Sequence, residues 1–296
     1  MNNKRKDIDK ISFDILKQSK SLGAFPTPVE KIVTYAELYV EKEKSILDIP
    51  KEYFDRSSEA LKRALRKING MLDRKEKIIY LDLEQVPARQ RFVQLHEVGH
   101  EVLPWQKKLY EVIQDDEITI QDVNDEFESE ANYFASATLF QLDRFEEELS
   151  KLPLEIKSGL LLSKQFGAST HATLRRYVEY SPKRCALLVL EKEQNTIITG
   201  CKARNYFQSG SFSKEFGLIK WDESLSLTYD FVRDYLLTNK RLHCNGQIAL
   251  LTTNGLTTFN YHFFNNTFNG FVFFYPHGEV NQVKTKIVVN SYKDIL

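Results

Sequence analysis

Two histidines and a glutamate within five residues constrain this chain more than any other feature. The stretch Arg91–His100 contains the pattern H-E-x-x-H, formed by His96, Glu97 and His100. On a helix, residues four apart lie on one face, one turn above the other. Both imidazoles can therefore reach one ion, and zinc accepts neutral imidazole nitrogen in a tetrahedral shell. Glu97 stands beside the first histidine, where its carboxylate can hold and deprotonate a water molecule on that ion.

The residues around this motif are typical of a helix. Pro87 can begin it, because the first helical residue needs no N–H donor. We expect the helix to end near Pro104, since proline disfavours helix in the residue before it. A buried face is indicated by apolar residues at helical spacing, which are Phe92, Leu95, Val98 and Val102. A chance spacing of two surface histidines is the alternative interpretation, and the rest of the chain disfavours it.

Size, charge and cysteine content narrow the class of protein. A chain of 296 residues holds two domains or one large one. Hydrophobic residues make up 42% and charged residues 28%, as in ordinary soluble proteins. Basic and acidic residues number 41 each, so no net charge favours nucleic-acid or membrane binding. The chain has no apolar run of transmembrane length, and its charged first residues lead us to expect no secretory signal. Three scattered cysteines, Cys185, Cys201 and Cys244, favour a reduced, cytoplasmic protein without a cysteine metal site.

The N-terminal segments show helical spacing and one hairpin. Residues 7–21 predict a helix, and a second is expected from about Pro28 to Glu41, with Thr27 as its cap. A third should start at Ser57 or Ser58 and stop near residue 70. Residues 71–83 predict a hairpin that turns at residues 73–76.

The second strand of this hairpin, residues 77–81, directly precedes the motif helix. An exposed strand edge can pair with an extended peptide through backbone hydrogen bonds. Ile79 and Tyr80 are therefore candidate substrate-binding residues. A covered structural strand explains the same residues equally well.

A third metal ligand is expected on the helix after the motif. Residues 106–127 are acidic and poorly periodic, and predict a solvated connection that passes over the cleft. The next helix should run from about Asn124 to Leu149. A catalytic zinc held by two histidines needs one more protein ligand, so that a fourth position stays open for water. The candidates on this helix are Glu126, Glu128 and Glu130.

Glu128 is favoured among these three glutamates. Asn132, four residues on, would point the same way and could orient a ligand histidine by a hydrogen bond. Ala131 is small enough to let this helix pack closely against the motif helix. Glu130 would project about 160° further round the helix, and we expect it to be solvated.

These residues resemble a known family in three places. The lead Arg89-Gln-Arg-Phe, the core H-E-x-G-H and Glu128-Ser-Glu-Ala-Asn-Tyr-Phe-Ala are similar to the motifs of the ImmA/IrrE family of metallo-endopeptidases. The resemblance covers about residues 25–180 and is weaker at 166–176. Members usually have Leu-Leu-Met-Pro soon after the last motif. Residues 138–145 of this chain depart from that pattern, which could alter the wall of the cleft.

The resemblance implies a zinc-dependent endopeptidase, a hydrolase with a mostly helical, zincin-like domain and a small sheet. Zn²⁺ would be bound by His96, His100 and Glu128, with Glu97 as general base. The substrate would be another intracellular protein, such as a transcriptional regulator or repressor cleaved under stress. The alternative is a zinc-bound regulatory scaffold that binds a protein partner without cutting it. Glu97 argues against the scaffold, because binding a metal needs only the ligands.

Residues 154–180 predict two short helices, with Ser169 capping the second, in an outline similar to a helix-turn-helix. His171, Arg175 and Arg176 could touch phosphate. A packing role is the better interpretation, because the neutral net charge argues against a nucleic-acid footprint, and we expect no direct nucleic-acid binding.

The C-terminal part of the chain has a different character. Strands are predicted at 185–190, 196–201, 247–252, 257–264, 268–275 and 284–290, with a helix at 225–237. We therefore expect an α+β protein with a peptidase domain at 1–182 and a mixed, sheet-rich domain at 183–296. IrrE-type members carry a GAF-like sensor domain there, which suggests ligand sensing or partner docking. The aromatic residues at 259–275 suit a sheet core better, and His243, His262 and His277 read as isolated turn or core residues.

Overall fold

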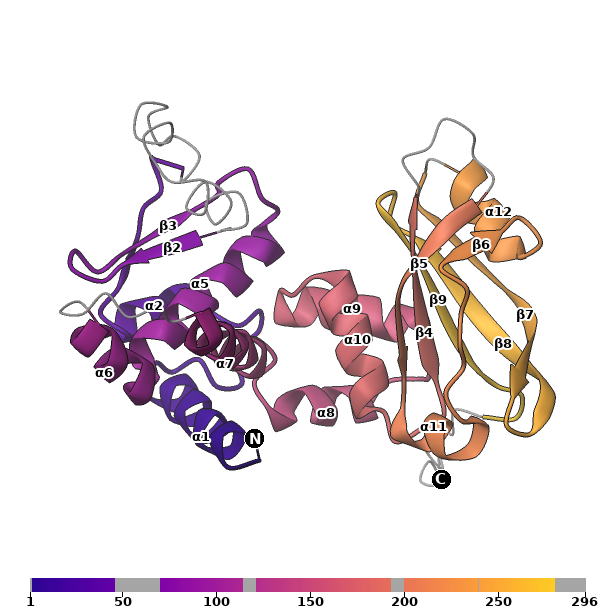
Figure 1. Cartoon of the computed structure of the whole chain (residues 1–296), viewed down its shortest axis with the longest axis horizontal. Helices are drawn as coiled ribbons and strands as arrows, with labels where there is room; N and C mark the ends of the chain where they lie inside the picture. Colours follow the sequence, from indigo (N-terminus) through magenta and orange to yellow (C-terminus); the bar gives the residue numbers. More distant parts are fainter. Residues whose placement is uncertain (1, 46–69, 114–120, 193–199, 239, 280–296) are drawn as a thin grey trace, which may run out of the picture. The chain divides into compact units, whose positions relative to one another are not determined.

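The computed structural model describes residues 2–45, 70–113, 121–192, 200–238 and 240–279 (Figure 1). The elements form an α+β protein, as expected from the sequence. Contacts divide it into two units, Met1–Glu147 with Leu160–Thr173, and Glu148–Gly159 with Leu174–Leu296. The predicted domain boundary after residue 182 stays a prediction. The helix expected from Ser57 or Ser58 and the strand at 284–290 lie outside the described residues.

The first unit begins with two helices. Helix α1 (Asn2–Gln18) buries Ile8, Ile15 and Leu16 at the predicted spacing. Helix α2 (Val29–Tyr35) lacks the expected cap, because the hydroxyl of Thr27 donates instead to Leu139 O at 2.7 Å. This helix ends six residues before the predicted end at Glu41, since the following residues enter a sheet.

That sheet is small, and the second strand of the predicted hairpin lies at its centre. Strand β1 (Tyr39–Val40) pairs in parallel with β3 (Ile78–Leu81), and β2 (Gly70–Asp73) pairs with β3 in antiparallel fashion. The strand order is β1-β3-β2, and Glu41 N donates to Ile79 O at 2.9 Å. The expectation that Ile79 and Tyr80 offer an open edge to substrate is therefore wrong, because neighbouring strands occupy both sides of β3.

Helices α5 and α6 carry the motif and its continuation. Helix α5 (Pro87–Val102) begins at Pro87 as predicted, and extended backbone at Leu103 ends it. Helix α6 (Pro104–Ile113) follows at once, where the sequence predicted a solvated connection. That prediction was wrong for 106–113, because Leu103 and Gln106 are fully buried and seat the start of α6 against the unit.

The helix opposite α5 is shorter than predicted. Helix α7 (Gln121–Leu139) is followed by α8 (Asp143–Ser150), and left-handed backbone at Gln141 and Leu142 separates them. Such backbone cannot continue a right-handed helix. The side chain of Gln141 accepts from Gly23 N at 2.7 Å and donates to Ala24 O at 2.8 Å. This buried amide fixes the turn after α7.

Helices α5 and α7 lie side by side and approach closely (Figure 1). A Cβ atom on Gly99 would stand 3.3 Å from the Cα of Ala131 and 3.0 Å from the ring of Phe134. Glycine on one helix and alanine on the other therefore permit the contact, as predicted for Ala131. The contact lies one turn from Glu128 and sets that side chain beside the motif.

The second unit is built on an antiparallel six-stranded sheet of order β6-β5-β4-β9-β8-β7. Helix α11 (Gly210–Phe216) and helix α12 (Asp230–Leu237) contribute Phe212 and Phe231 to its apolar core. The predicted helix at 225–237 is in part strand β6. The strands are β4 (Ala186–Lys192), β5 (Gly200–Gln208), β6 (Ser224–Ser226), β7 (Leu242–Thr252), β8 (Gly255–Asn265) and β9 (Asn269–Pro276).

Two further helices precede this sheet, α9 (Ile156–Phe166) and α10 (Thr170–Tyr180). Ser169 caps α10 as predicted, since its hydroxyl accepts from Ala172 N at 3.2 Å. Tyr177 stacks on Phe273 at 5.3 Å between ring centroids, so aromatic residues of β8 and β9 form a sheet core. Arg176 is buried, in keeping with a packing role, whereas Arg175 is exposed and pairs with Glu179 at 2.8 Å.

In the described part of the chain, no helix combines the length and the apolar character needed to cross a membrane.

Candidate metal centre

The two motif histidines face the same point. His96 and His100 both extend from α5, and their Nε2 atoms lie 3.1 Å apart. Their rings are nearly perpendicular, at 87°, with centroids 4.6 Å apart. This arrangement follows from the spacing of four residues on a helix, which stacks the two side chains on one face.

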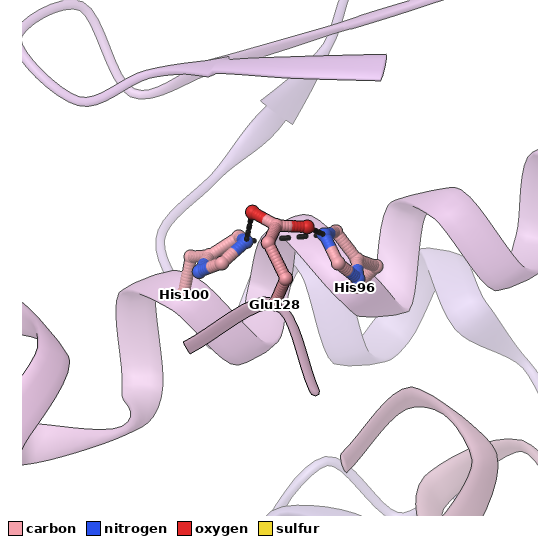
Figure 2. A group of neighbouring side chains, drawn as sticks. All are labelled: His96, His100 and Glu128. Carbon is pink, nitrogen blue, oxygen red and sulfur yellow. Dashed lines mark hydrogen bonds and ion pairs between the residues drawn. The ribbon is translucent and has the colours of Figure 1, made fainter. Parts of the chain in front are cut away.

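Glu128 of α7 reaches both imidazoles (Figure 2). Its Oε2 lies 3.1 Å from His96 Nε2 and its Oε1 lies 3.3 Å from His100 Nε2. The potential ligand atoms of the three residues all fall within 4.8 Å of one another. The side chain of His100 is only 8% exposed, whereas that of Glu128 is 54% exposed. The histidine side of the group is therefore buried in the unit, and the side of the Glu128 carboxylate is open to solvent.

The charges in this group are strongly coupled. Hydrogen bonds with His100 and His96 hold the pKa of the Glu128 carboxyl well below its usual range. Burial acts to lower the pKa of His100, but its hydrogen bond with Glu128 and the charge of Glu97 outweigh burial and raise that pKa. The negative charges of the Glu128 and Glu97 carboxylates therefore favour a cation at the two imidazoles. Two imidazole nitrogens and one carboxylate oxygen are a donor set that zinc accepts.

Glu97 lies on the buried side of the motif. It is 7% exposed, and burial raises the pKa of its carboxyl although His96 and His100 oppose the shift. Within the described residues its carboxyl makes no hydrogen bond to another group. A carboxylate whose pKa is raised is a stronger proton acceptor than an ordinary carboxylate. The structure therefore places an available acid–base group next to the three candidate ligands.

The ring of His100 is held from behind by Gln106 of α6. Its Nδ1 lies 2.8 Å from Gln106 Oε1, and Gln106 is fully buried. Asn132, which we expected in this role, is exposed and forms no hydrogen bond to either imidazole in the described structure. Sequence reasoning missed Gln106 because residues 106–113 were taken for a solvated connection. The helix-breaking Pro104 followed by apolar residues at helical spacing was the available signal.

Glu130 is buried, contrary to the expectation that it is solvated. Its Oε2 accepts from Trp105 Nε1 at 2.7 Å and from Gln106 Nε2 at 2.9 Å. Lys4 of α1 forms an ion pair with it at 3.1 Å. Burial would raise the pKa of Glu130, but these hydrogen bonds outweigh it and lower that pKa. The Glu130 carboxylate is thus a buried hydrogen-bond acceptor that holds the side chains of Trp105 and Gln106.

The remaining candidate and its neighbours lie at the surface of α7. Glu126 is 58% exposed and pairs with Lys4 at 2.8 Å. The hydroxyl of Tyr133 donates to Asp9 at 2.9 Å. Within the described residues, His96, His100 and Glu128 are the group that could hold a metal ion. The structure brings neither Glu126 nor Glu130 into it.

The hairpin is tied to the end of the motif helix. Arg74 Nη1 donates to His100 O at 3.1 Å, which connects the turn between β2 and β3 with α5. Buried Glu101 accepts from Lys77 at 2.7 Å and from Lys107 at 2.9 Å. These contacts hold the last turn of α5 at the start of α6.

An H-E-x-x-H helix with a carboxylate from a neighbouring helix defines a metallopeptidase-type domain. Residues 45–177 match a peptidase family described as the IrrE N-terminal-like domain. The match confirms, for this part of the chain, the resemblance to ImmA/IrrE proteins.

A similar fold occurs in a solved Mycobacterium tuberculosis transcriptional regulator. The TM-score is 0.50 and the identity 12%, over 91% of this chain and 75% of that one. An identity this low shows a likeness of fold alone. No curated protein matches the chain significantly.

Proposed function

We propose that this chain is a zinc-dependent endopeptidase that cleaves an intracellular protein. The observation that carries the proposal is the convergence of His96, His100 and Glu128 within 4.8 Å, with the buried carboxyl of Glu97 beside them. The match of residues 45–177 to a peptidase family supports the same chemistry. A transcriptional regulator is the proposed class of substrate, in line with the regulatory role implied by the family resemblance.

The residues of the site have separate tasks in peptide hydrolysis. When bound, zinc would polarise the scissile carbonyl and make a water molecule more acidic. His96 and His100 would hold the ion through neutral Nε2 atoms, and Glu128 would complete the donor set from α7. Glu97 accepts the proton of the attacking water and delivers it to the leaving amine.

Substrate would reach the site from the side of Glu128, where the group is open to solvent. The cleaved segment must be extended or unfolded locally, because Glu97 and His100 are themselves buried. Strand β3 does not serve as its docking edge, since both sides of that strand are paired.

The proposed function is tested by comparing the native chain with Glu97→Gln. Each protein is assayed for bound zinc, and new protein N-termini are identified by mass spectrometry in cells that express it. We expect Glu97→Gln to retain zinc and to lose cleavage by about 100-fold or more, because general base catalysis is removed. Glu126→Gln, an exposed change on α7, is the control and should cleave like the native chain.

Two results would contradict the proposal in different ways. A native chain without bound zinc would remove the metal centre altogether. A native chain that holds zinc and binds a partner but creates no new N-terminus would identify the alternative, a zinc-bound regulatory scaffold.

A further inference from the structure

We infer that Gln106 is a positioning residue that fixes the tautomer and orientation of the His100 ring for metal binding. This inference rests on the proposed function, since it concerns the same metal. It is carried by a buried hydrogen-bond chain that runs from His100 through Gln106 to Glu130.

The orientation of the Gln106 amide follows from its partners. Its nitrogen lies 3.1 Å from the carbonyl oxygen of Phe127 and 2.9 Å from Oε2 of Glu130. A carbonyl and a carboxylate accept hydrogen bonds and do not donate, so the NH₂ group of the amide must face both of them. The amide oxygen then faces His100, and the reverse orientation would place oxygen against two oxygens.

This orientation decides which nitrogen of His100 carries the proton. The oxygen of Gln106 can only accept, so Nδ1 of His100, 2.8 Å away, must be the donor. In a neutral imidazole the other nitrogen, Nε2, then keeps its lone pair. That nitrogen faces His96 and Glu128. Gln106 therefore holds His100 in the tautomer whose Nε2 lone pair can bind a metal ion.

Glu130 in turn holds the amide in place. It accepts from Trp105 Nε1 at 2.7 Å as well as from Gln106, and Lys4 neutralises its charge. Residues of four helices, α1, α5, α6 and α7, take part in these contacts, so the hydrogen-bond chain forms only when the unit is folded. His96 lacks such support in the described structure, since its buried Nδ1 has no hydrogen-bond partner. The two histidines are therefore held unequally.

The test replaces Gln106 with methionine, which has similar length and volume but cannot hold the imidazole. The matched control is Gln141→Met. Gln141 is also a buried glutamine of the first unit with three hydrogen bonds, to Gly23, Ala24 and Thr27, but it does not touch the site. Both changes remove an internal amide, and only one removes the partner of His100.

Zinc affinity is measured by competition with a chromophoric chelator, after circular dichroism has verified folding of each metal-free protein. We expect Gln106→Met to weaken zinc binding by about 10- to 100-fold, the usual effect of losing a partner of a metal-bound histidine. We expect Gln141→Met to leave it within about threefold, although both variants melt at lower temperature. The Co²⁺ absorption spectrum should change in Gln106→Met alone.

A measurement on the native chain needs no variant. In the zinc-loaded protein, ¹⁵N NMR of the histidine ring should show Nδ1–H and a metal-bound Nε2 at His100. Zinc bound through Nδ1, or equal zinc affinity in Gln106→Met and the native chain, would overturn the inference while leaving the metal site intact. Failure of the native chain to bind zinc would instead overturn the proposed function, and this inference with it.

Discussion

Three glutamates within five residues of α7 occupy three different environments. Glu126 is exposed and pairs with Lys4, Glu128 contacts both motif histidines, and Glu130 is buried among hydrogen-bond donors. Successive residues of a helix are rotated by about 100°, so carboxylates two residues apart point to nearly opposite sides. The same residue type therefore serves at the surface, at the site and behind it.

Exchange of these glutamates for alanine should separate their roles. Glu128→Ala should weaken zinc binding by more than about 100-fold, because a ligand matters more than a partner behind a ligand. Glu126→Ala should change it by less than about threefold, since exposed ion pairs contribute little. Chelator competition measures both. Equal losses in the two variants would exclude Glu128 as a ligand.

Among the elements, α5 and α7 depend most on each other. One supplies the H-E-x-x-H motif and the other the third candidate ligand, and they meet where Gly99 faces Ala131. Helix α6 supports them from behind through Gln106, and the hairpin holds the end of α5 through Arg74. The spacing of these helices therefore controls the distance between the histidines and Glu128.

A larger residue at position 99 should disturb both stability and metal binding. Gly99→Val would place its side chain against Ala131 and Phe134 and force α5 and α7 apart. We expect a loss of about 1–3 kcal/mol in the free energy of unfolding, as for other overpacked positions. Zinc affinity should fall as well, because Glu128 moves with α7.

The control for this change is Gly210→Ala in α11. A Cβ atom there meets nothing within 4 Å, so the free energy of unfolding should change by less than about 0.5 kcal/mol. Urea denaturation followed by circular dichroism measures both variants. A stable Gly99→Val protein with native zinc affinity would show that the close helix contact is not needed.

At the scale of the molecule, the chain forms two units with separate cores. The candidate metal centre belongs wholly to the first, whereas the second is a sheet covered by α11 and α12 on one face. Several of its aromatic residues, among them Phe259, Phe263 and Phe274, are completely buried and stabilise the sheet. A sensing or docking role for this unit stays a hypothesis.

Zinc removal should therefore affect one unit and not the other. A ligand that binds only the folded state stabilises it by about 2.7 kcal/mol at a hundred times its dissociation constant. Chelation should speed amide hydrogen exchange in α5 and α7 and leave β4, β8 and β9 within about twofold. Hydrogen-exchange mass spectrometry with and without zinc measures this. Equal acceleration in the sheet would show that the metal stabilises both units together.

What the sequence determined by itself was local. The spacing of His96 and His100, the start of α5 at Pro87 and the hairpin before it depend on residues near one another in the chain. Helical and strand periodicity act over a few residues, and pattern alone reveals them. The same reasoning favoured Glu128, because a third ligand had to come from a nearby helix.

Only the tertiary structure decided which groups surround these residues. Pairing with β1 closed the edge of β3, and packing of α6 buried Gln106 and gave Glu130 its donors. Thr27 and Gln141 lie over 100 residues apart and are joined by a hydrogen bond. Such contacts depend on which distant segments are brought together, and the local periodicity of the sequence cannot predict them. The motif was readable from the chain, whereas the support of the motif exists only once the unit has folded.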